Sequence, residues 1–254
     1  MENFSLSFSV ISAANENIQM KYLKEDQSIG DADSGEDVAE SSILLEAQLQ
    51  DFRRQMLELP PNYDPIARAD LLLQIGRTLI RLENKQDAWE AGREAFDIYI
   101  GREAWEGAVQ ACDIMFLSEQ PESLAALGQG IWLAVTFPMD PELTVAMLQH
   151  VVDETPPDSD GAAVAATVAH YVVDLRAEGR VREDLMFYTN QLLATVARRH
   201  SDVKDQGAFS QWFKKLELED PAKFLPRLRN VVDVLVQDEW WIDRDAILAK
   251  LPVQ

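Results

Sequence analysis

The stretch LLLQIGRTLIRLENKQDAWEAGREAFDIYIG, Leu71 to Gly101, carries the main fold prediction for this chain. It contains two apolar patterns of helical period on either side of a short polar segment, ENKQ. Apolar residues that recur every three or four positions predict an amphipathic helix. A connection of this length is typical of two antiparallel helices. The stretch therefore predicts a helix hairpin.

The rest of the chain repeats this pattern, with prolines, glycines and Asp-Pro pairs at most of the breaks. Pairs of predicted helices begin near residues 64, 102, 141, 181 and 221, a period of about 38 to 40 residues. Such a period predicts an all-α fold, an α-solenoid of antiparallel helix pairs in which neighbours share one core. The predicted helices cover 39–59, as a capping helix, and 64–83, 86–99, 102–117, 121–136, 141–153, 160–177, 181–200, 204–216, 221–236 and 242–251.

The first hairpin also resembles a tetratricopeptide repeat in its spacing. The matching positions are Leu72, Ile75, Gly76 and Leu79 in the first helix and Ala88 and Ala95 in the second. The first hairpin departs from the family at Gly92, where the family usually has a large aromatic residue. In the second pair, Trp105 stands at the family's tryptophan position. The resemblance covers residues 64–178. Because the period exceeds 34 residues, HEAT-like or irregular helix pairs stay open as alternatives.

Charge and composition narrow the function classes. The chain has 254 residues with 23 basic and 44 acidic side chains, a net charge of −21, which disfavours binding to nucleic acid or to an anionic membrane. No apolar run reaches the roughly 18 residues of a membrane-spanning helix. The single cysteine, Cys112, fits a reducing compartment, and the N-terminus lacks the positive charge of a signal peptide. We expect a cytoplasmic protein.

The N-terminal segment differs from the rest of the chain. Residues 24–38 are acidic, rich in Ser, Gly and Asp, and poor in large apolar residues, so they cannot bury enough surface to offset their ordering entropy. We expect a largely disordered tail over 1–38 and a single helical-repeat domain over 39–254. Residues 179–254 would form its C-terminal helices.

No cluster of residues predicts a reaction, a metal or a cofactor. Cys112 lies in the middle of an apolar helix pattern, which is typical of a buried thiol. His150, His170 and His200 lack the close spacing of zinc ligands. Ser201 with Lys204 spells S-x-x-K without its companion motifs, so a helix cap is the better interpretation of Ser201. We expect no catalytic residue, no metal and no cofactor.

A groove is the remaining candidate site. The resemblance implies that the first helices of successive pairs line a concave face. That face would carry Leu73, Arg77, Ile80 and Arg81 from one pair and Glu106, Gln110 and Asp113 from the next. Arg77 and Arg81 are one turn apart and suit a shared carboxylate or acidic peptide, unless they form ion pairs within the chain.

Trp240 and Trp241 form a second candidate surface, because two adjacent tryptophans cannot both face one core from a single helix. Their packing against the last helix is the alternative.

The sequence thus favours a non-enzymatic protein-binding adaptor or assembly and maturation chaperone. Its partner would be basic, an unassembled subunit, or an acidic peptide at Arg77 and Arg81, with no nucleic acid and no membrane. One alternative is an enzyme or cofactor-handling protein whose site comes from distant helices. Another is a structural subunit that self-associates through Trp240 and Trp241.

Overall fold

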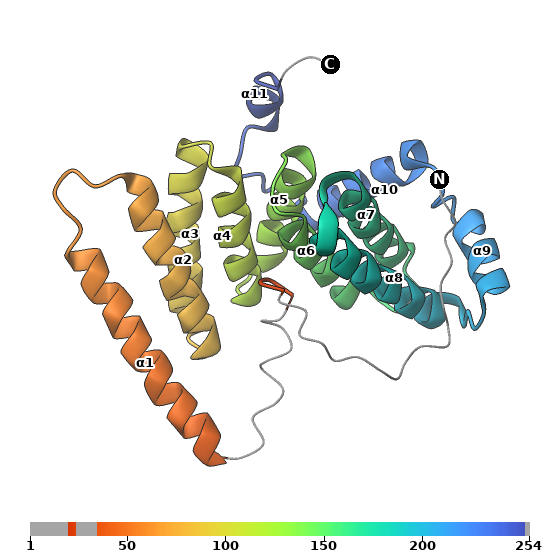
Figure 1. Cartoon of the computed structure of the whole chain (residues 1–254). Coiled ribbons are helices and arrows are strands. Elements are labelled where there is room, and N and C mark those ends of the chain that lie inside the picture. Colours follow the sequence, from red (N-terminus) through yellow and green to blue (C-terminus); the bar gives the residue numbers. More distant parts are fainter. Residues whose placement is uncertain (1–19, 24–34, 252–254) are drawn as a thin grey trace. The chain divides into compact units, whose positions relative to one another are not determined.

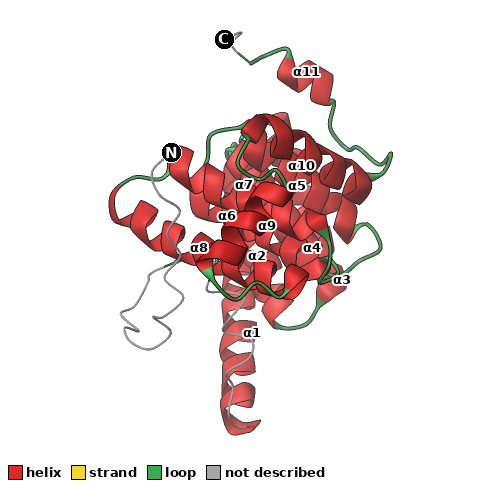
Figure 2. Cartoon of the chain, turned by 90° about the vertical axis from the view of Figure 1, so that its right-hand side faces the viewer, coloured by secondary structure: helices red, strands yellow, loops and turns green. Residues whose placement is uncertain are grey.

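The computed structural model describes residues 20–23 and 35–251, and all regular secondary structure in these ranges is helical (Figures 1 and 2). The prediction of an all-α fold is confirmed. The predicted tail lies mostly outside the described residues, except that 35–38 belong to the first helix and 20–23 are placed. Within the described ranges, no helix is both long enough and apolar enough to cross a lipid bilayer.

The chain divides into two compact units. Unit 1 comprises residues 1–31 and 138–231, and unit 2 comprises 32–137 and 232–254. A single domain over 39–254 stays a prediction. Unit 2 contains α1 (Gly35–Leu57), α2 (Pro65–Arg81), α3 (Lys85–Gly101), α4 (Trp105–Leu117), α5 (Ser123–Thr136) and α11 (Arg244–Leu248). Unit 1 contains α6 (Pro141–Glu154), α7 (Asp160–Arg176), α8 (Gly179–Ser201) and α9 (Gln206–Lys215), and α10 (Pro221–Val236) contributes to both units.

Neighbouring helices pack in sequence order, as predicted. In unit 2 each helix from α1 to α5 contacts the next, and α2 also contacts α4 (Figure 1). Four small residues of α2, α3 and α4 are fully buried: Ala69, Ala88, Ala95 and Ala108. Small side chains let two helix backbones approach closely, so these alanines set the spacing of the row.

Gly76 and Gly92 are among the glycines of unit 2 where an added side chain would collide with a neighbouring helix. A Cβ atom on Gly76 would lie 2.9 Å from Ile114 Cγ2, and one on Gly92 would lie 2.9 Å from Met115 Cγ. The Gly92 site is also closed by the main-chain oxygen of Ala111, at 3.3 Å from the same Cβ position. The departure of Gly92 from the tetratricopeptide pattern therefore has a local cause, because α4 fills the space that an aromatic side chain would need.

Helix ends differ from the sequence prediction. Asn84 caps the start of α3, whereas Gly101 is the last residue of that helix, and the residues with left-handed backbone are Glu83 (φ 57°) and Glu103 (φ 55°). The Ala104 N–H donates to Tyr99 O at 2.9 Å and the Glu103 N–H to Ile100 O at 3.1 Å, the pattern of a Schellman end. Glu103 occupies the left-handed position after α3, where glycine is usual, so the residue type does not reveal this helix end.

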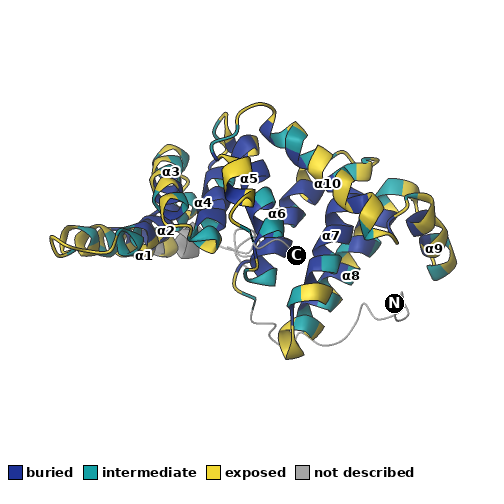
Figure 3. Cartoon of the chain, turned by 90° about the horizontal axis from the view of Figure 1, so that it is seen from above, coloured by how far each residue is buried: buried dark blue, intermediate teal, exposed yellow. Residues whose placement is uncertain are grey.

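Unit 1 places its helices in the same sequential way, α6 against α7, α7 against α8, and α8 against α9. Asp140, Ser159 and Asp205 cap the starts of α6, α7 and α9 by accepting main-chain N–H groups. The alanine-rich α7 is buried along most of its length (Figure 3). Tyr171 of α7 meets Phe224 edge to face at 5.5 Å.

We predict that Gly92→Ala destabilises the protein and that Gly101→Ala does not. The added methyl at Gly92 overpacks against Met115 and a main-chain oxygen, whereas a Cβ at Gly101 meets nothing within 4 Å. Overpacking opposes the gain in helix propensity at Gly92 but not at Gly101, so the two variants should differ by about 2 kcal/mol in unfolding free energy. Urea unfolding followed by circular dichroism measures this difference. Equal stabilities would contradict the tight approach of α3 and α4.

Candidate functional site

The predicted groove residues of α2 and α4 come together in part. The Arg77 Nη2 atom donates to Gln110 Oε1 at 2.8 Å, which joins the two helices through side chains 33 positions apart. Leu73 is only 4% exposed and Asp113 only 9%, so these two contribute to the core and offer little surface. Ile80, Arg77 and Gln110 are half-buried, and Arg81 and Glu106 are exposed. We call the last five residues the α2–α4 strip.

A tyrosine–carboxylate pair joins α3 to α2, and no pattern in the sequence predicts it. The Tyr99 hydroxyl of α3 donates to Asp70 Oδ1 of α2 at 2.6 Å, and Tyr99 is 3% exposed. Burial raises the pKa of Tyr99 well above its usual range, the bond to Asp70 and the Asp70 charge raise it further, and Arg77 opposes them. Tyr99 therefore stays protonated at neutral pH and serves as a hydrogen-bond donor.

Trp240 and Trp241 pack on different elements of unit 2. The Trp241 ring meets Trp89 and Phe96 edge to face, at 6.0 and 5.7 Å, and the Arg93 guanidinium lies 4.3 Å from its centroid. Trp240 meets Trp132 at 6.2 Å, with the Arg244 guanidinium 3.8 Å from its centroid. The pair thus anchors the C-terminal segment to α3 and α5, although both rings keep intermediate exposure. Their role as a partner surface stays a prediction.

A buried amide completes this anchor. Gln129 of α5 is fully buried. Its Oε1 accepts from the main-chain N–H of Trp241 at 2.9 Å, and its Nε2 donates to the main-chain oxygen of Glu239 at 3.3 Å. Both ends of the side chain are therefore used in holding the turn that precedes α11.

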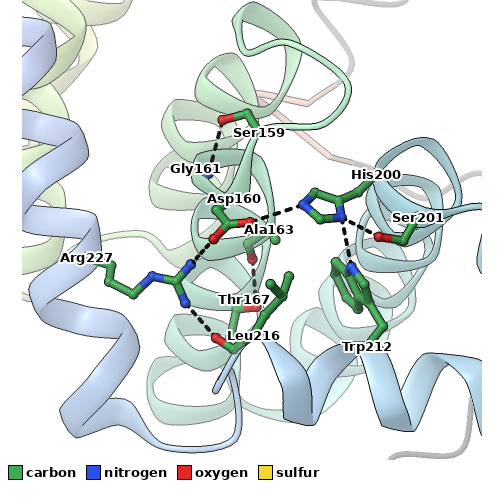
Figure 4. Close-up of polar contacts among 10 residues, drawn as sticks. All are labelled: Ser159, Asp160, Gly161, Ala163, Thr167, His200, Ser201, Trp212, Leu216 and Arg227. Carbon is green, nitrogen blue, oxygen red and sulfur yellow. Dashed lines mark hydrogen bonds and ion pairs between the residues drawn. The ribbon is translucent and has the colours of Figure 1, made fainter.

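In unit 1, Asp160 is the centre of a polar cluster that joins four helices (Figure 4). Asp160, at the start of α7, accepts from Arg227 Nη2 of α10 at 2.9 Å and from His200 Nε2 of α8 at 3.1 Å. Trp212 Nε1 of α9 donates to His200 Nδ1 at 3.1 Å, and Arg227 Nη1 also donates to Leu216 O at 2.6 Å. The cluster therefore ties the C-terminal parts of α8 and α9 and the middle of α10 to the start of α7.

This cluster contains a hydroxyl, an imidazole and a carboxylate in the order found in nucleophilic enzymes. Ser201 Oγ lies 2.6 Å from His200 Nδ1, on the side of the ring opposite to Asp160. The indole N–H of Trp212 points to the same nitrogen, so the lone pair that a general base would use already accepts a hydrogen bond. The hydrogen bonds from Trp212 and to Asp160 hold His200 in the tautomer protonated at Nε2. This geometry fits a structural role for His200 better than activation of Ser201.

The other candidate residues have local partners. Cys112 is fully buried as predicted, and burial raises the pKa of its thiol, which keeps it protonated. The Thr189 hydroxyl donates to Leu185 O at 2.9 Å and lies 3.0 Å from His170 Nδ1, so this nitrogen carries the imidazole proton. Burial is the main cause that lowers the pKa of His170 from 6.5 to about 4.

A further contact in unit 1 joins residues far apart in the sequence. The N–H groups of Tyr22 and Leu23 both donate to Glu142 Oε1 in the first turn of α6, at 2.5 and 3.1 Å. Tyr22 is 7% exposed, Leu23 5% and Glu142 9%. The sequence does not predict this contact, because a short segment inside a polar tail carries no periodic signal.

Comparisons of the sequence and structure with protein-family models, with curated proteins and with solved structures find no match. Within residues 20–23 and 35–251 the chain has 11 helices, and neighbouring helices pack in sequence order.

We predict that Asp160→Ala lowers the unfolding free energy by about 1–2 kcal/mol, because it removes the shared partner of Arg227 and His200 at a half-exposed site. Asp158→Ala is the matched control, since Asp158 is an exposed aspartate in the preceding turn. Urea titration of both variants measures the effect. A loss no larger than that of the control would show that the cluster is not a tie between helices.

We predict that His170 makes the protein less stable as pH falls from about 6.5 towards 4. The unfolded chain takes up the proton near the ordinary pKa of 6.5 and the folded chain only near 4, so acid favours unfolding in this window. Between pH 7 and pH 5 the wild type should lose about 2 kcal/mol more than His170→Asn, which keeps a donor for Thr189 but does not titrate. Parallel pH dependences would contradict a neutral, buried His170.

Proposed function

We propose that this chain is a non-enzymatic protein-binding scaffold, an adaptor or assembly chaperone, that holds a segment of a partner protein against the α2–α4 strip. The partner would be an unassembled or loosely folded subunit rather than a nucleic acid, because the net charge of −21 repels phosphate backbones.

The observation that supports this proposal is the bond between Arg77 and Gln110, which makes one continuous polar row from two successive first helices. A surface that spans two helix pairs is the usual site for an extended ligand in helical-repeat proteins. Ile80 adds a half-buried apolar contact beside this row. Apolar and polar contacts together are what a specific protein interface needs.

The strip also has a direction. Because α3 returns between them, α2 and α4 run the same way (Figure 1). Arg81 follows Arg77 by one helical turn and Glu106 precedes Gln110 by one turn, so the two exposed charges lie at opposite ends, separated by about 11 Å along the helix axes. A bound segment would therefore place an acidic residue at Arg81 and a basic residue near Glu106, which selects one orientation.

Arg81→Glu tests the proposal better than a change at Arg77, whose bond to Gln110 joins two helices. Affinity capture from native lysate should recover about ten-fold less of the partner with Arg81→Glu, because repulsion replaces attraction at a contacted cation. Arg102→Glu is the matched control, with the same charge change at an exposed position outside the strip. If both variants retain the wild-type partners, the strip is not the binding surface.

A further inference from the structure

We infer that unit 1 carries a second binding site, for a short peptide segment that turns, at the first turn of α6, and that residues 20–23 of the same chain are its resident ligand. This inference does not depend on the proposed role of the α2–α4 strip, since it rests on contacts of Glu142 within unit 1.

Main-chain recognition is the first reason. The N–H groups of two successive residues, Tyr22 and Leu23, converge on one oxygen of Glu142 at 2.5 and 3.1 Å. These residues precede Glu142 by 120 and 119 positions, so the contact is not a by-product of local chain geometry. A carboxylate that accepts two main-chain donors fixes the backbone of a segment in place, and buried side chains then add to its affinity.

The burial of Glu142 is the second reason. Its residue is 9% exposed, and a carboxylate removed from water needs hydrogen-bond donors. Asp140 caps α6 by accepting the Glu142 N–H at 2.9 Å, while the Glu142 side chain accepts the N–H groups of Tyr22 and Leu23. The start of α6 also favours a negative charge through the helix dipole. Without a docked segment, Glu142 would lose both of these donors.

The side chains define the class of ligand. Tyr22 and Leu23 are 7% and 5% exposed, so an aromatic and an aliphatic residue are buried together with the main-chain anchor. Lys21 Nζ lies 4.6 Å from the centroid of the Tyr22 ring and donates to its hydroxyl at 2.8 Å. The surrounding sequence, KYLK, is basic in a strongly acidic chain. The site therefore fits a basic segment that turns at an aromatic–aliphatic pair and has no proline at either position.

Because residues 20–23 occupy the site, they prevent another peptide from binding there. A ligand carried on the same chain competes at a high effective concentration, so a free peptide of the same class binds only after it displaces residues 20–23. Removal of the resident side chains should therefore open the site to an added peptide, whereas loss of the Glu142 carboxylate should close it.

A fluorescent, end-capped peptide QMKYLKE, the sequence of residues 19–25, tests this with the full chain. Fluorescence anisotropy should show at least ten-fold tighter binding to the double variant Tyr22→Ala/Leu23→Ala than to the wild type. Adding Glu142→Ala to that double variant should weaken binding by at least ten-fold, because two charge-assisted hydrogen bonds are lost. Glu142→Gln, which keeps an acceptor oxygen and the side-chain shape, should weaken it less. Circular dichroism verifies that each variant is folded.

The matched control peptide carries N-methyl-leucine at the position of Leu23, which removes one N–H donor and leaves the side chain unchanged. It should bind the double variant about ten-fold more weakly than the parent peptide. Equal binding of the parent peptide to the wild type and the double variant would overturn self-occupation. Insensitivity to both Glu142 and the N-methyl group would overturn the site. A wild-type dimer that dissociates in the double variant, detected by light scattering, would assign the segment to a second copy and overturn occupation in cis.

Discussion

The close approach of neighbouring helices at small residues is the constraint on which the row of helices in unit 2 depends. At Gly76 and Gly92 the facing helix, α4, lies so near that a methyl group would collide with Ile114 or Met115. Ala88, Ala95 and Ala108 are fully buried at similar crossings. Because the helices approach so closely, side chains on α2 and α4 can reach one another directly. The bond between Arg77 and Gln110 is a consequence of this spacing.

Buried polar groups then determine where the less regular segments lie. Gln129 uses both ends of its amide to hold the turn before α11, and Asp160 collects Arg227 and His200. Glu142 accepts two N–H groups from residues 22 and 23. In each case a polar side chain largely removed from water, or shared between helices, gains donors from a segment distant in the sequence. Such contacts specify a single arrangement because an unsatisfied buried polar group costs more than a satisfied one contributes.

These features favour binding over catalysis as the proposed role. The described titratable groups with strongly shifted pKa values are Tyr99, Cys112 and His170, and burial is the main cause in each. At neutral pH these groups are a buried hydrogen-bond donor, a protonated thiol and a neutral imidazole. By contrast, the exposed charges of the α2–α4 strip and the carboxylate of Glu142 are groups suited to hold a polypeptide segment.

The sequence by itself determined the helical class, the order of the helices and most of their boundaries, because apolar period and proline or aspartate caps are local signals. It also indicated the small residues of the first hairpin, since helix crossings restrict side-chain size. The tertiary structure alone decided that Leu73 is core, that Gly92 faces Met115, and that Glu83 and Glu103 adopt left-handed turns. It alone brought Tyr22 and Leu23 to Glu142 and Trp212 to His200. Contacts between residues far apart depend on how helices stack, and no local pattern in the chain encodes that geometry.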